Sequence, residues 1–300
     1  MGANHARVVS SNSFAELVGY YDPQDQKTEL EIQRFESEAA LIDACDVAII
    51  ANPSSQHVST AKKVLSKGKS CLVEKPLATS LDDARELQQM AMKSRGRAFV
   101  GMVERFNPSV IAAKRVIAHG ELGEVLNIST VRQGPRPERI KDVGVDLDLA
   151  VHDLDLVGYL CNSTIESMDS RLKRISERSG YPDFFSSVGA LKNGATFSNR
   201  VNWHYPIKER KVWIQGTRSA LEIDLLRVEA RLVDFGSSSQ DWPALSQAYG
   251  VSKGRITELS LDYKEPLQLE LQSFLASVAE DEVREVCTLE EAISVLRWVL

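Results

Sequence analysis

The sequence predicts an α/β protein in two parts: a doubly wound domain around a parallel sheet, then an α+β domain with a large, mainly antiparallel sheet. Up to about residue 120, short apolar runs alternate with helical patterns. After Gly120, most segments alternate apolar and polar residues between turn signals. A chain of 300 residues that is 43% hydrophobic is long enough to form two cores. We therefore expect domains at 1–120 and 121–300.

Four apolar runs in the first part have the composition of strands buried in a parallel sheet. They cover residues 15–21, 47–51, 70–73 and 98–102. Between them, residues 58–66 show a helical pattern that ends at Gly68, and Ser80 followed by Asp83 marks the start of another helix. This alternation predicts a Rossmann-type fold, a class that binds dinucleotides at the carboxyl ends of its strands.

The start of the chain departs from that fold. The fold opens with an apolar strand and a turn that carries the first two glycines of G-x-G-x-x-G, whereas Gly2 stands where the third glycine is expected. We therefore expect the first strand to be missing, together with the turn whose N–H groups receive a pyrophosphate. Either the natural gene product is longer, or the chain is a fragment whose cofactor binding is impaired.

Six segments of the second part have the patterns of strands. They cover residues 125–132, 186–191, 196–203, 211–215, 221–225 and 228–235. Turn signals at Lys192-Asn193-Gly194 and Gly216-Thr217 indicate hairpins and hence an antiparallel sheet. Helices over 147–160 and 267–278 are expected to cover one face of this sheet.

Composition excludes several classes of function. The formal net charge of -6 argues against a nucleic-acid partner. No apolar run approaches the roughly 18 residues that span a bilayer, and the amino terminus lacks a signal-peptide core, so we expect a cytoplasmic protein without a membrane partner. The four cysteines are scattered without C-x-x-C spacing, which supports neither a zinc site nor a disulfide framework.

Lys75, Asp148 and His152 have the residue types of a proton-handling site. Residues i and i+4 share a helix face, so Asp148 can orient the imidazole of His152 while its other nitrogen takes a proton. Lys75 follows an apolar run, where a strand end in an α/β sheet meets the ligand crevice. Taken singly, each has an ordinary alternative: a solvated loop lysine, and a surface Asp/His pair.

Six short motifs stand in the order found in one enzyme family. They are Gly2-x-x-His5-Ala6-Arg7, Leu17-Val18-Gly19-Tyr20-Tyr21-Asp22, Asn52-Pro53-x-x-x-His57, Val73-Glu74-Lys75-Pro76-Leu77, Glu104-Arg105-Phe106-Asn107-Pro108 and Asp148-Leu149-Ala150-Val151-His152-Asp153. With these motifs the chain resembles, over nearly its whole length, the Gfo/Idh/MocA family of nicotinamide-dependent sugar and polyol oxidoreductases. The ordered set is far more specific than any one motif.

The resemblance implies a role for each motif. The family's catalytic Lys, Asp and His fall on Lys75, Asp148 and His152. The residues that would hold NAD or, less favoured, NADP are Gly2, His5, Asp22, Asn52, Pro53, His57, Glu74 and Lys75. Those that would bind substrate are Arg105, Asn107, Arg132, Arg136, Arg139, Asp148 and His152. The resemblance also implies a homodimer or homotetramer in which a second subunit covers the other face of the antiparallel sheet.

Asp22 favours NAD over NADP. It lies 20 residues after Gly2 at the end of an expected strand, where a carboxylate can accept hydrogen bonds from ribose hydroxyls and repel a 2′-phosphate. The alternative is that Asp22-Pro23 is an ordinary turn that ends a strand.

A basic loop precedes Asp148 and is the candidate segment for substrate selection. Arg132, Arg136, Arg139 and Lys141 lie within ten residues that also contain two prolines. Guanidinium groups suit phosphate oxygens, and a stiff loop loses less entropy on closing around them. The segment resembles the family branch that acts on nucleotide sugars such as UDP-N-acetylglucosamine, although a solvated basic loop beside acidic residues would look the same.

These observations predict oxidation of a secondary ring alcohol, with His152 as general base and Lys75 bound to the same oxygen. The reaction requires no metal, and the acidic residues near His152 are explained by the dipole at a helix start. Three hypotheses stay open: a nucleotide-sugar dehydrogenase acting at C3 of UDP-N-acetylglucosamine, an inositol or free-sugar dehydrogenase, and a non-catalytic paralogue that lacks the phosphate turn.

Overall fold

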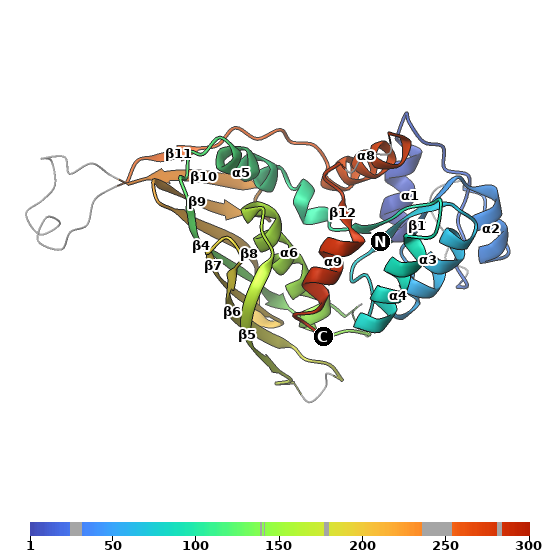
Figure 1. Ribbon diagram of the computed structural model, residues 1–300, viewed down its shortest axis with the longest axis horizontal. Coiled ribbons are helices and arrows are strands. Elements are labelled where there is room, and N and C mark those ends of the chain that lie inside the picture. The colour runs from blue at the N-terminus through green and yellow to red at the C-terminus, as the bar shows by residue number, and fades with distance from the viewer. Residues whose placement is uncertain (25–31, 139, 141, 177–179, 236–253, 281–283) are drawn as a thin grey trace, which may run out of the picture. The chain divides into compact units, whose positions relative to one another are not determined.

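The computed structural model describes residues 1–24, 32–138, 140, 142–176, 180–235, 254–280 and 284–300, and these residues form two compact units (Figure 1). The first comprises Met1–Phe106, Arg139–Asp155 and Lys264–Leu300. The second comprises Asn107–Glu138 and Leu156–Tyr263. The chain leaves and re-enters the first unit twice. The functional division at residue 120 stays a prediction.

In the first unit, four strands form one sheet in the order β1-β2-β3-β12. They are β1 (Val47–Ile50), β2 (Ser70–Glu74), β3 (Ala98–Gly101) and β12 (Cys287–Thr288). The first three run parallel, and β12 pairs with β3 in the antiparallel direction. The parallel strands coincide with three of the predicted apolar runs, which confirms the Rossmann-type domain. β12 is too short for a sequence pattern to indicate it.

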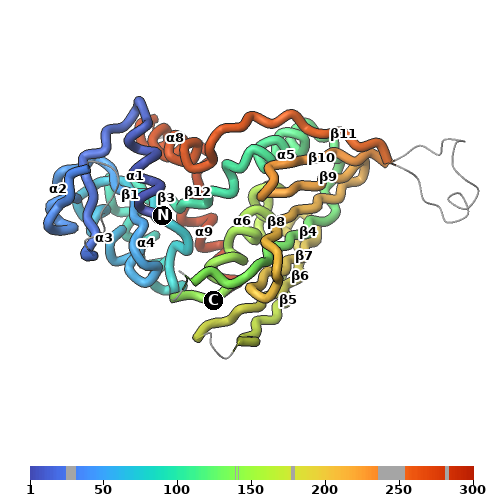
Figure 2. The backbone as a smooth tube through the Cα atoms, turned by 180° about the vertical axis from the view of Figure 1, so that it is seen from behind, coloured from blue at the N-terminus to red at the C-terminus, as the bar shows by residue number. Residues whose placement is uncertain are grey.

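Helices cover both faces of this sheet. They are α1 (Gly2–Ser10), α2 (Glu38–Ala44), α3 (His57–Ser66), α4 (Leu81–Ala91), α8 (Pro266–Ala279) and α9 (Leu289–Leu296), with the 3₁₀ turns η1 (Ser54–Gln56) and η2 (Val103–Phe106). α1 and α8 lie on one side, and α3 and α4 on the other (Figures 1 and 2). The Ser80 hydroxyl accepts a hydrogen bond from the backbone N of Asp83 at 3.1 Å, which confirms the predicted start of α4. Gly68, at a φ of +70°, follows α3 as predicted.

The predicted strand at 15–21 is wrong. In the described part of the chain, this segment forms only an isolated bridge between Tyr20 and Arg34, and it is not a member of the β1-β2-β3-β12 sheet. Its apolar composition correctly favours burial: Ala15 and Leu17 pack against the core formed by α1, β2, β3 and α8. A ladder, however, requires a neighbouring strand whose N–H and C=O groups face it, and composition alone does not supply one.

In the second unit, eight strands form one sheet in the order β11-β10-β9-β8-β4-β7-β6-β5. They are β4 (Val125–Pro135), β5 (Ile165–Lys173), β6 (Phe184–Leu191), β7 (Thr196–Asn202), β8 (His204–Gly216), β9 (Ser219–Asp224), β10 (Glu229–Asp234) and β11 (Ile256–Glu258). Neighbours are antiparallel except for β4 and β7, which run parallel. The large, mainly antiparallel sheet is therefore confirmed, and β5 and β11 are additions to the predicted strands.

The helices on this sheet differ from the prediction. α8, predicted over 267–278, belongs to the first unit, where Phe274 packs edge to face on Phe99 with ring centroids 6.0 Å apart. α5 (Pro108–Ala118), which the sequence patterns did not indicate, contacts β9 and β10 instead. An apolar helix face reveals that the helix is covered but not which sheet covers it.

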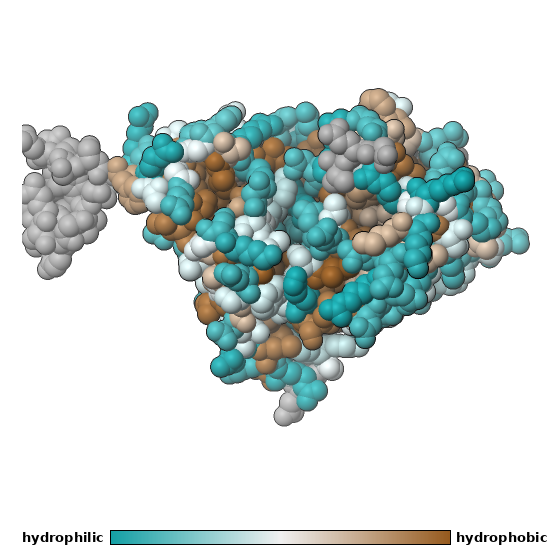
Figure 3. Space-filling model, viewed as in Figure 1, coloured by the Kyte–Doolittle hydropathy of each residue, from teal (hydrophilic) through white to brown (hydrophobic). Residues whose placement is uncertain are grey.

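On the face shown in Figure 3, the surface of the first unit is mostly polar. In the view of Figure 3, hydrophilic side chains cover most of the surface of the first unit's outer helices. Among the described residues, no helix has both the length and the apolar composition needed to cross a bilayer.

Candidate active site

Lys75 stands directly after β2, at the carboxyl edge of the parallel sheet. All five residues of β2 are buried, so the strand ends where the chain first reaches a less enclosed position. The Lys75 side chain is 18% exposed, and the peptide bond to Pro76 is cis. The carboxyl edge is where α/β sheets bind their ligands, so Lys75 occupies the predicted kind of position.

The Lys75 ammonium binds Asp148 twice. Its Nζ lies 2.7 Å from Asp148 Oδ1 and 2.8 Å from the Asp148 carbonyl oxygen. The Asp148 side chain is only 7% exposed, so this ion pair is shielded from water and from salt. An ammonium group has three N–H donors, and two of them are used here. The geometry therefore orients a third donor that a ligand oxygen could accept.

Asp148 and His152 lie on one continuous helical stretch, but the stretch is not regular. Residues Asp146–Ala150 form a π-helix, η3, and α6 (Val151–Cys161) follows it. The prediction of an α-helix over 147–160 is therefore wrong in its first turn. The Lys75 ammonium donates a hydrogen bond to the Asp148 carbonyl oxygen, which in an α-helix would accept from the backbone N–H four residues later. A side chain that competes for such a backbone hydrogen bond is a known cause of local irregularity in helices.

His152 is 8% exposed and lies in the first turn of α6. Sequence spacing predicted that Asp148 would bind the His152 imidazole, whereas in the structure the Asp148 carboxylate binds the Lys75 ammonium. The Asp148–His152 contact stays a prediction. The structure does bring Lys75 and Asp148 together although they are 73 positions apart in the sequence. His152 follows about one turn later on the same helical stretch.

Three cofactor-site residues of the sequence analysis gather at the carboxyl end of β1. His57 Nδ1 lies 2.7 Å from the Pro76 carbonyl oxygen, and Nε2 lies 2.9 Å from the Asn52 carbonyl oxygen. Both ring nitrogens thus contact backbone carbonyl oxygens, and His57 links the segment after β1 to the segment after β2. Burial lowers the pKa of His57, because the charged imidazolium is poorly solvated there. Pro53 lies between Asn52 and the turn η1.

The residues at this edge fit a dinucleotide. The Asn52 amide donates to Thr60 Oγ1 at 3.0 Å, while Asn52 Oδ1 is buried without a hydrogen-bond partner among the described residues. Buried polar atoms in native proteins normally have a partner, so this oxygen marks a place for a hydrogen-bond donor. β1 and β2 are parallel, and their carboxyl ends place Asn52 and Lys75 along one edge.

Asp22, His5 and Gly2 occupy different surroundings. One Asp22 carboxylate oxygen accepts a hydrogen bond from the Gln24 backbone N at 2.8 Å, which closes a turn of the kind weighed as its alternative role. His5 Nε2 lies 2.6 Å from Glu74 Oε1, and both side chains are buried. Gly2 is the exposed first residue of α1.

Arg105 and Asn107 are engaged inside the protein. The Arg105 guanidinium forms two hydrogen bonds with Asp155, of 2.6 and 2.8 Å, and a third of 3.2 Å with Glu291. Asn107 caps α5 by accepting from the Ser109 backbone N at 3.0 Å, and it donates to the Leu225 carbonyl oxygen. These contacts give both residues structural roles. Their substrate contacts stay a prediction.

The basic loop is described only in part. Arg132 lies on β4 and is 2% exposed, and the Arg136 guanidinium stacks over the Trp203 ring at 5.3 Å from its centroid. Both belong to the second compact unit. Arg139 and Lys141 lie outside the described residues.

Sequence reasoning missed three buried acidic residues of the first unit. Asp155 binds Arg105, burial raises the pKa of Asp146, and Glu270 is completely buried on α8. The available signal was a charged residue within an otherwise apolar helix. Charged residues are almost never fully buried unless paired, so such a position indicates a buried polar contact.

Two family models match the chain. Residues 1–102 match the oxidoreductase family with an NAD-binding Rossmann fold, and residues 110–222 match the Gfo/Idh/MocA C-terminal domain.

Several curated proteins are similar over long stretches. Glucose-6-phosphate 3-dehydrogenase of Bacillus subtilis is 32% identical over 63% of this chain, an alignment that covers 61% of that relative. UDP-N-acetylglucosamine 3-dehydrogenase of Acidithiobacillus ferrooxidans is 23% identical over 93% of this chain and 86% of that relative. Inositol 2-dehydrogenase of Rhizobium meliloti is 25% identical over 74% of this chain and 72% of that relative.

Solved structures share the fold. The UDP-N-acetylglucosamine 3-dehydrogenase of Acidithiobacillus ferrooxidans superposes with a TM-score of 0.86 at 21% identity, over 99% of this chain and 91% of that chain. An oxidoreductase from Agrobacterium radiobacter, in complex with NAD⁺, L-tartaric acid and magnesium, gives a TM-score of 0.82 at 16% identity over 99% and 91% of the two chains.

Proposed function

This chain belongs to the Gfo/Idh/MocA family of sugar and polyol oxidoreductases, and from that premise we propose that it oxidises a secondary hydroxyl of a nucleotide sugar with NAD. UDP-N-acetylglucosamine, oxidised at C3, is the proposed substrate. The observation that carries the proposal is the buried Lys75–Asp148 ion pair at 2.7 Å, with His152 one helical turn further on.

The three residues divide the work of proton handling. His152 accepts the proton of the substrate hydroxyl as general base, because histidine is the side chain that ordinarily gains and loses a proton near neutral pH. Asp148 stabilises the imidazolium and positions the Lys75 ammonium. Lys75 donates its remaining N–H to the same oxygen and stabilises the negative charge that develops there. When bound, the nicotinamide ring accepts the hydride from the sugar carbon.

Cofactor binding falls to residues at the carboxyl edge of the sheet. Asn52, Pro53 and Lys75 contact the dinucleotide directly, and His57 holds the backbone on which they stand. Gly2, His5 and Glu74 are the other residues proposed for the cofactor site. Asp22 recognises the adenosine ribose and selects NAD over NADP. Replacing it as Asp22→Ser should lower the ratio of kcat/KM for NAD to that for NADP, and a wild-type enzyme that prefers NADP would contradict this assignment.

The basic loop binds the diphosphate in this proposal. Arg132, Arg136 and Arg139 supply guanidinium groups, which bind phosphate oxygens more strongly than neutral donors do. The similarity to a UDP-N-acetylglucosamine dehydrogenase over 93% of the chain supports this choice of substrate.

A free polyol is the second candidate. Inositol 2-dehydrogenases are among the similar proteins, at 25% identity over 74% of this chain for the Rhizobium meliloti enzyme. The two candidates are separated by incubating purified protein and NAD with UDP-sugars or with inositols, and by following NADH absorbance. Turnover of inositols alone would replace the nucleotide-sugar assignment, and turnover of neither class would count against the reaction itself.

We also propose that the protein acts in the cytoplasm as a homodimer or homotetramer joined through the open face of its large sheet. Val188, Ser198, Ser129 and Trp213 are successive cross-strand neighbours on that face. Val188 is 57% exposed and Trp213 38% exposed, which leaves apolar surface for a partner copy. Trp213→Glu should shift the mass measured by light scattering toward the monomer.

A further inference from the structure

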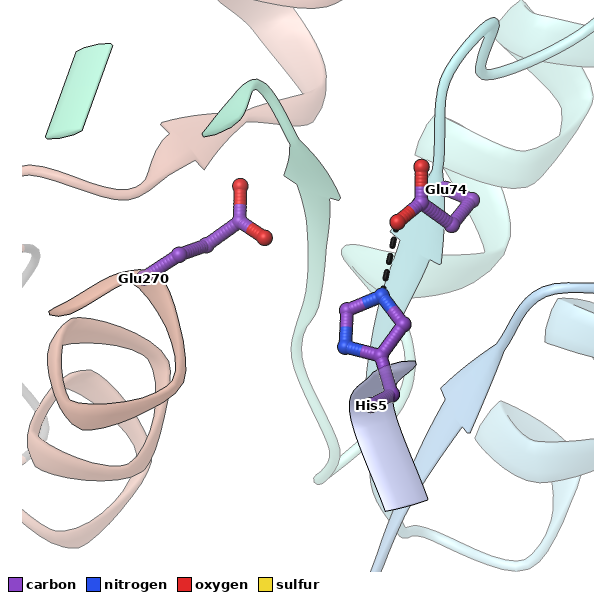
Figure 4. A group of neighbouring side chains, drawn as sticks. All are labelled: His5, Glu74 and Glu270. Carbon is purple, nitrogen blue, oxygen red and sulfur yellow. Dashed lines mark hydrogen bonds and ion pairs between the residues drawn. The ribbon is translucent and has the colours of Figure 1, made fainter. Parts of the chain in front are cut away.

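Three buried side chains of the first unit converge although they are far apart in the sequence. His5 comes from α1, Glu74 from the end of β2 and Glu270 from α8, with the Glu270 carboxylate directed toward the other two (Figure 4). One ligand atom from each, an imidazole nitrogen or a carboxylate oxygen, lies within 4.8 Å of the others. His5 is 4% exposed, Glu74 7% and Glu270 0%.

Glu270 is the residue that demands an explanation. Neither of its carboxylate oxygens has a hydrogen-bond partner among the described residues. Leaving a buried polar group unsatisfied is costly, and leaving an ionised one unsatisfied costs more. Buried charges in native proteins are paired or coordinate a metal.

Gly101 leaves space for a shared occupant. A Cβ atom built on Gly101 would lie 3.6 Å from Glu270 Oε2 and also 3.6 Å from Glu74 Oε1. One oxygen of each carboxylate therefore lies 3.6 Å from the same point, beside a residue of β3 that has no side chain. His5 Nε2 lies 2.6 Å from Glu74 Oε1 and is the third potential metal ligand.

The two acidic side chains favour a cation once Glu270 has lost its proton. Two carboxylates face one imidazole, and the nearby Arg105 donates to Asp155 and Glu291. Burial raises the pKa of Glu270 well above its usual value, the Glu74 charge raises it further, and Arg105 opposes the shift. A cation that binds here would displace a proton from Glu270, as metals do from their ligands.

We propose that His5, Glu74 and Glu270 form a structural site for a divalent transition metal such as Zn²⁺ or Mn²⁺. One imidazole nitrogen with two carboxylates is a donor set that suits these ions, whereas Mg²⁺ and Ca²⁺ prefer oxygen ligands. A tetrahedral ion would require His5 Nε2 and Glu74 Oε1 to separate to about 3.4 Å, a distance that side-chain rotation can supply. The bound ion would link α1, β2 and α8, and the proposal does not depend on the substrate.

The first experiment measures metal content and thermal stability of the whole protein. Chelator-treated wild type is incubated with Zn²⁺, desalted and analysed for metal, and its melting temperature is recorded with and without Zn²⁺, Mn²⁺ or Mg²⁺. We expect one Zn²⁺ per chain and, near 100 times the dissociation constant, a melting temperature raised by roughly 5–10 °C. Mg²⁺ should leave the melting temperature unchanged.

Variants locate the site. Glu270→Gln keeps the side-chain volume but removes the anionic ligand, so it should lose the bound Zn²⁺ and its thermal effect. Glu280→Gln, at the exposed end of the same helix, is the matched control and should behave as wild type. His5→Gln removes the nitrogen ligand and gives a second test if Glu270→Gln fails to fold.

Two results would overturn the proposal. Wild type that retains no Zn²⁺ and melts at one temperature under all conditions would indicate that the carboxylates share a proton instead. Equal Zn²⁺ binding by wild type and by a folded Glu270→Gln variant would place the ion elsewhere.

Discussion

Two buried ion pairs involve aspartates of the same helical stretch in the first unit. Lys75 binds Asp148 near its start, and Arg105 binds Asp155 seven residues later. The Arg105 side chain is 4% exposed, and its planar fork matches the Asp155 carboxylate at 2.6 and 2.8 Å. The Lys75 side chain is 18% exposed and binds one carboxylate oxygen and one carbonyl. Each pair joins a cation to an aspartate, but the two cations differ in how many hydrogen-bond donors they have left for a ligand.

The difference teaches how a buried ion pair can be assigned a role. The Arg105 guanidinium binds Asp155 with two hydrogen bonds and also contacts the Glu291 carboxylate, so its role is to stabilise the fold. An ammonium is a compact charge with three rotatable donors, so Lys75 can hold Asp148 and still bind a ligand oxygen. We therefore expect changes at the Arg105 pair to act on stability and changes at the Lys75 pair to act on turnover.

The largest effect should come from His152, which lies between the two aspartates. His152→Ala should lower kcat by about 10² to 10⁴-fold, the usual contribution of general-base catalysis, with little change in the KM for NAD. Steady-state kinetics with a responsive sugar substrate measure this. Near-normal turnover would remove His152 from the mechanism and leave the Lys75 pair as its only catalytic part.

Arg105→Met tests the structural pair. The substitution leaves the Asp155 carboxylate buried without the guanidinium that pairs with it. The free energy of unfolding should therefore fall by about 3–5 kcal/mol in urea titrations. Lys63→Met, in an exposed pair with Glu38, is the control and should change stability little. Arg105→Lys, which retains the charge, should fall between these two. If Arg105→Lys kept full stability but lost affinity for substrate, Arg105 would be a binding residue and the contrast would fail.

Lys75→Met tests the catalytic pair. Met keeps the side-chain length but cannot donate to the developing oxyanion, so kcat should fall by roughly 10² to 10³-fold. The variant should still fold, and circular dichroism with urea titration checks that. A collapse of stability with kcat preserved in the folded fraction would show that both pairs are structural.

The smallest effect should come from the basic loop of the second unit. If Arg136 meets a diphosphate, Arg136→Ala should raise the KM for a UDP-sugar by roughly 10 to 100-fold, the loss of one charge-assisted contact, without altering the KM for any free sugar. Arg227→Ala, at an exposed arginine in the turn between β9 and β10, is the matched control. Equal kinetics on both substrate classes would favour the free-polyol alternative.

Local patterns predicted most of the elements because burial and capping are written in neighbouring residues. β1, β2 and β3 are short apolar runs, and Ser80 caps α4 with its own hydroxyl. β5 escaped detection because most of its residues are exposed, which leaves no apolar alternation to detect. The parallel pairing of β4 with β7 could not be read either, since it joins strands that are not consecutive in the chain.

The sequence by itself determined the fold class, the family and the residues that carry its motifs, because these depend on residue type and order along the chain. Tertiary structure alone decided which charges meet. It placed Asp148 on Lys75, committed Arg105 to Asp155, and brought Glu270 to His5 and Glu74. The physical reason is that an ion pair depends on distance and solvent exposure, and both are set by how segments from distant parts of the chain pack together.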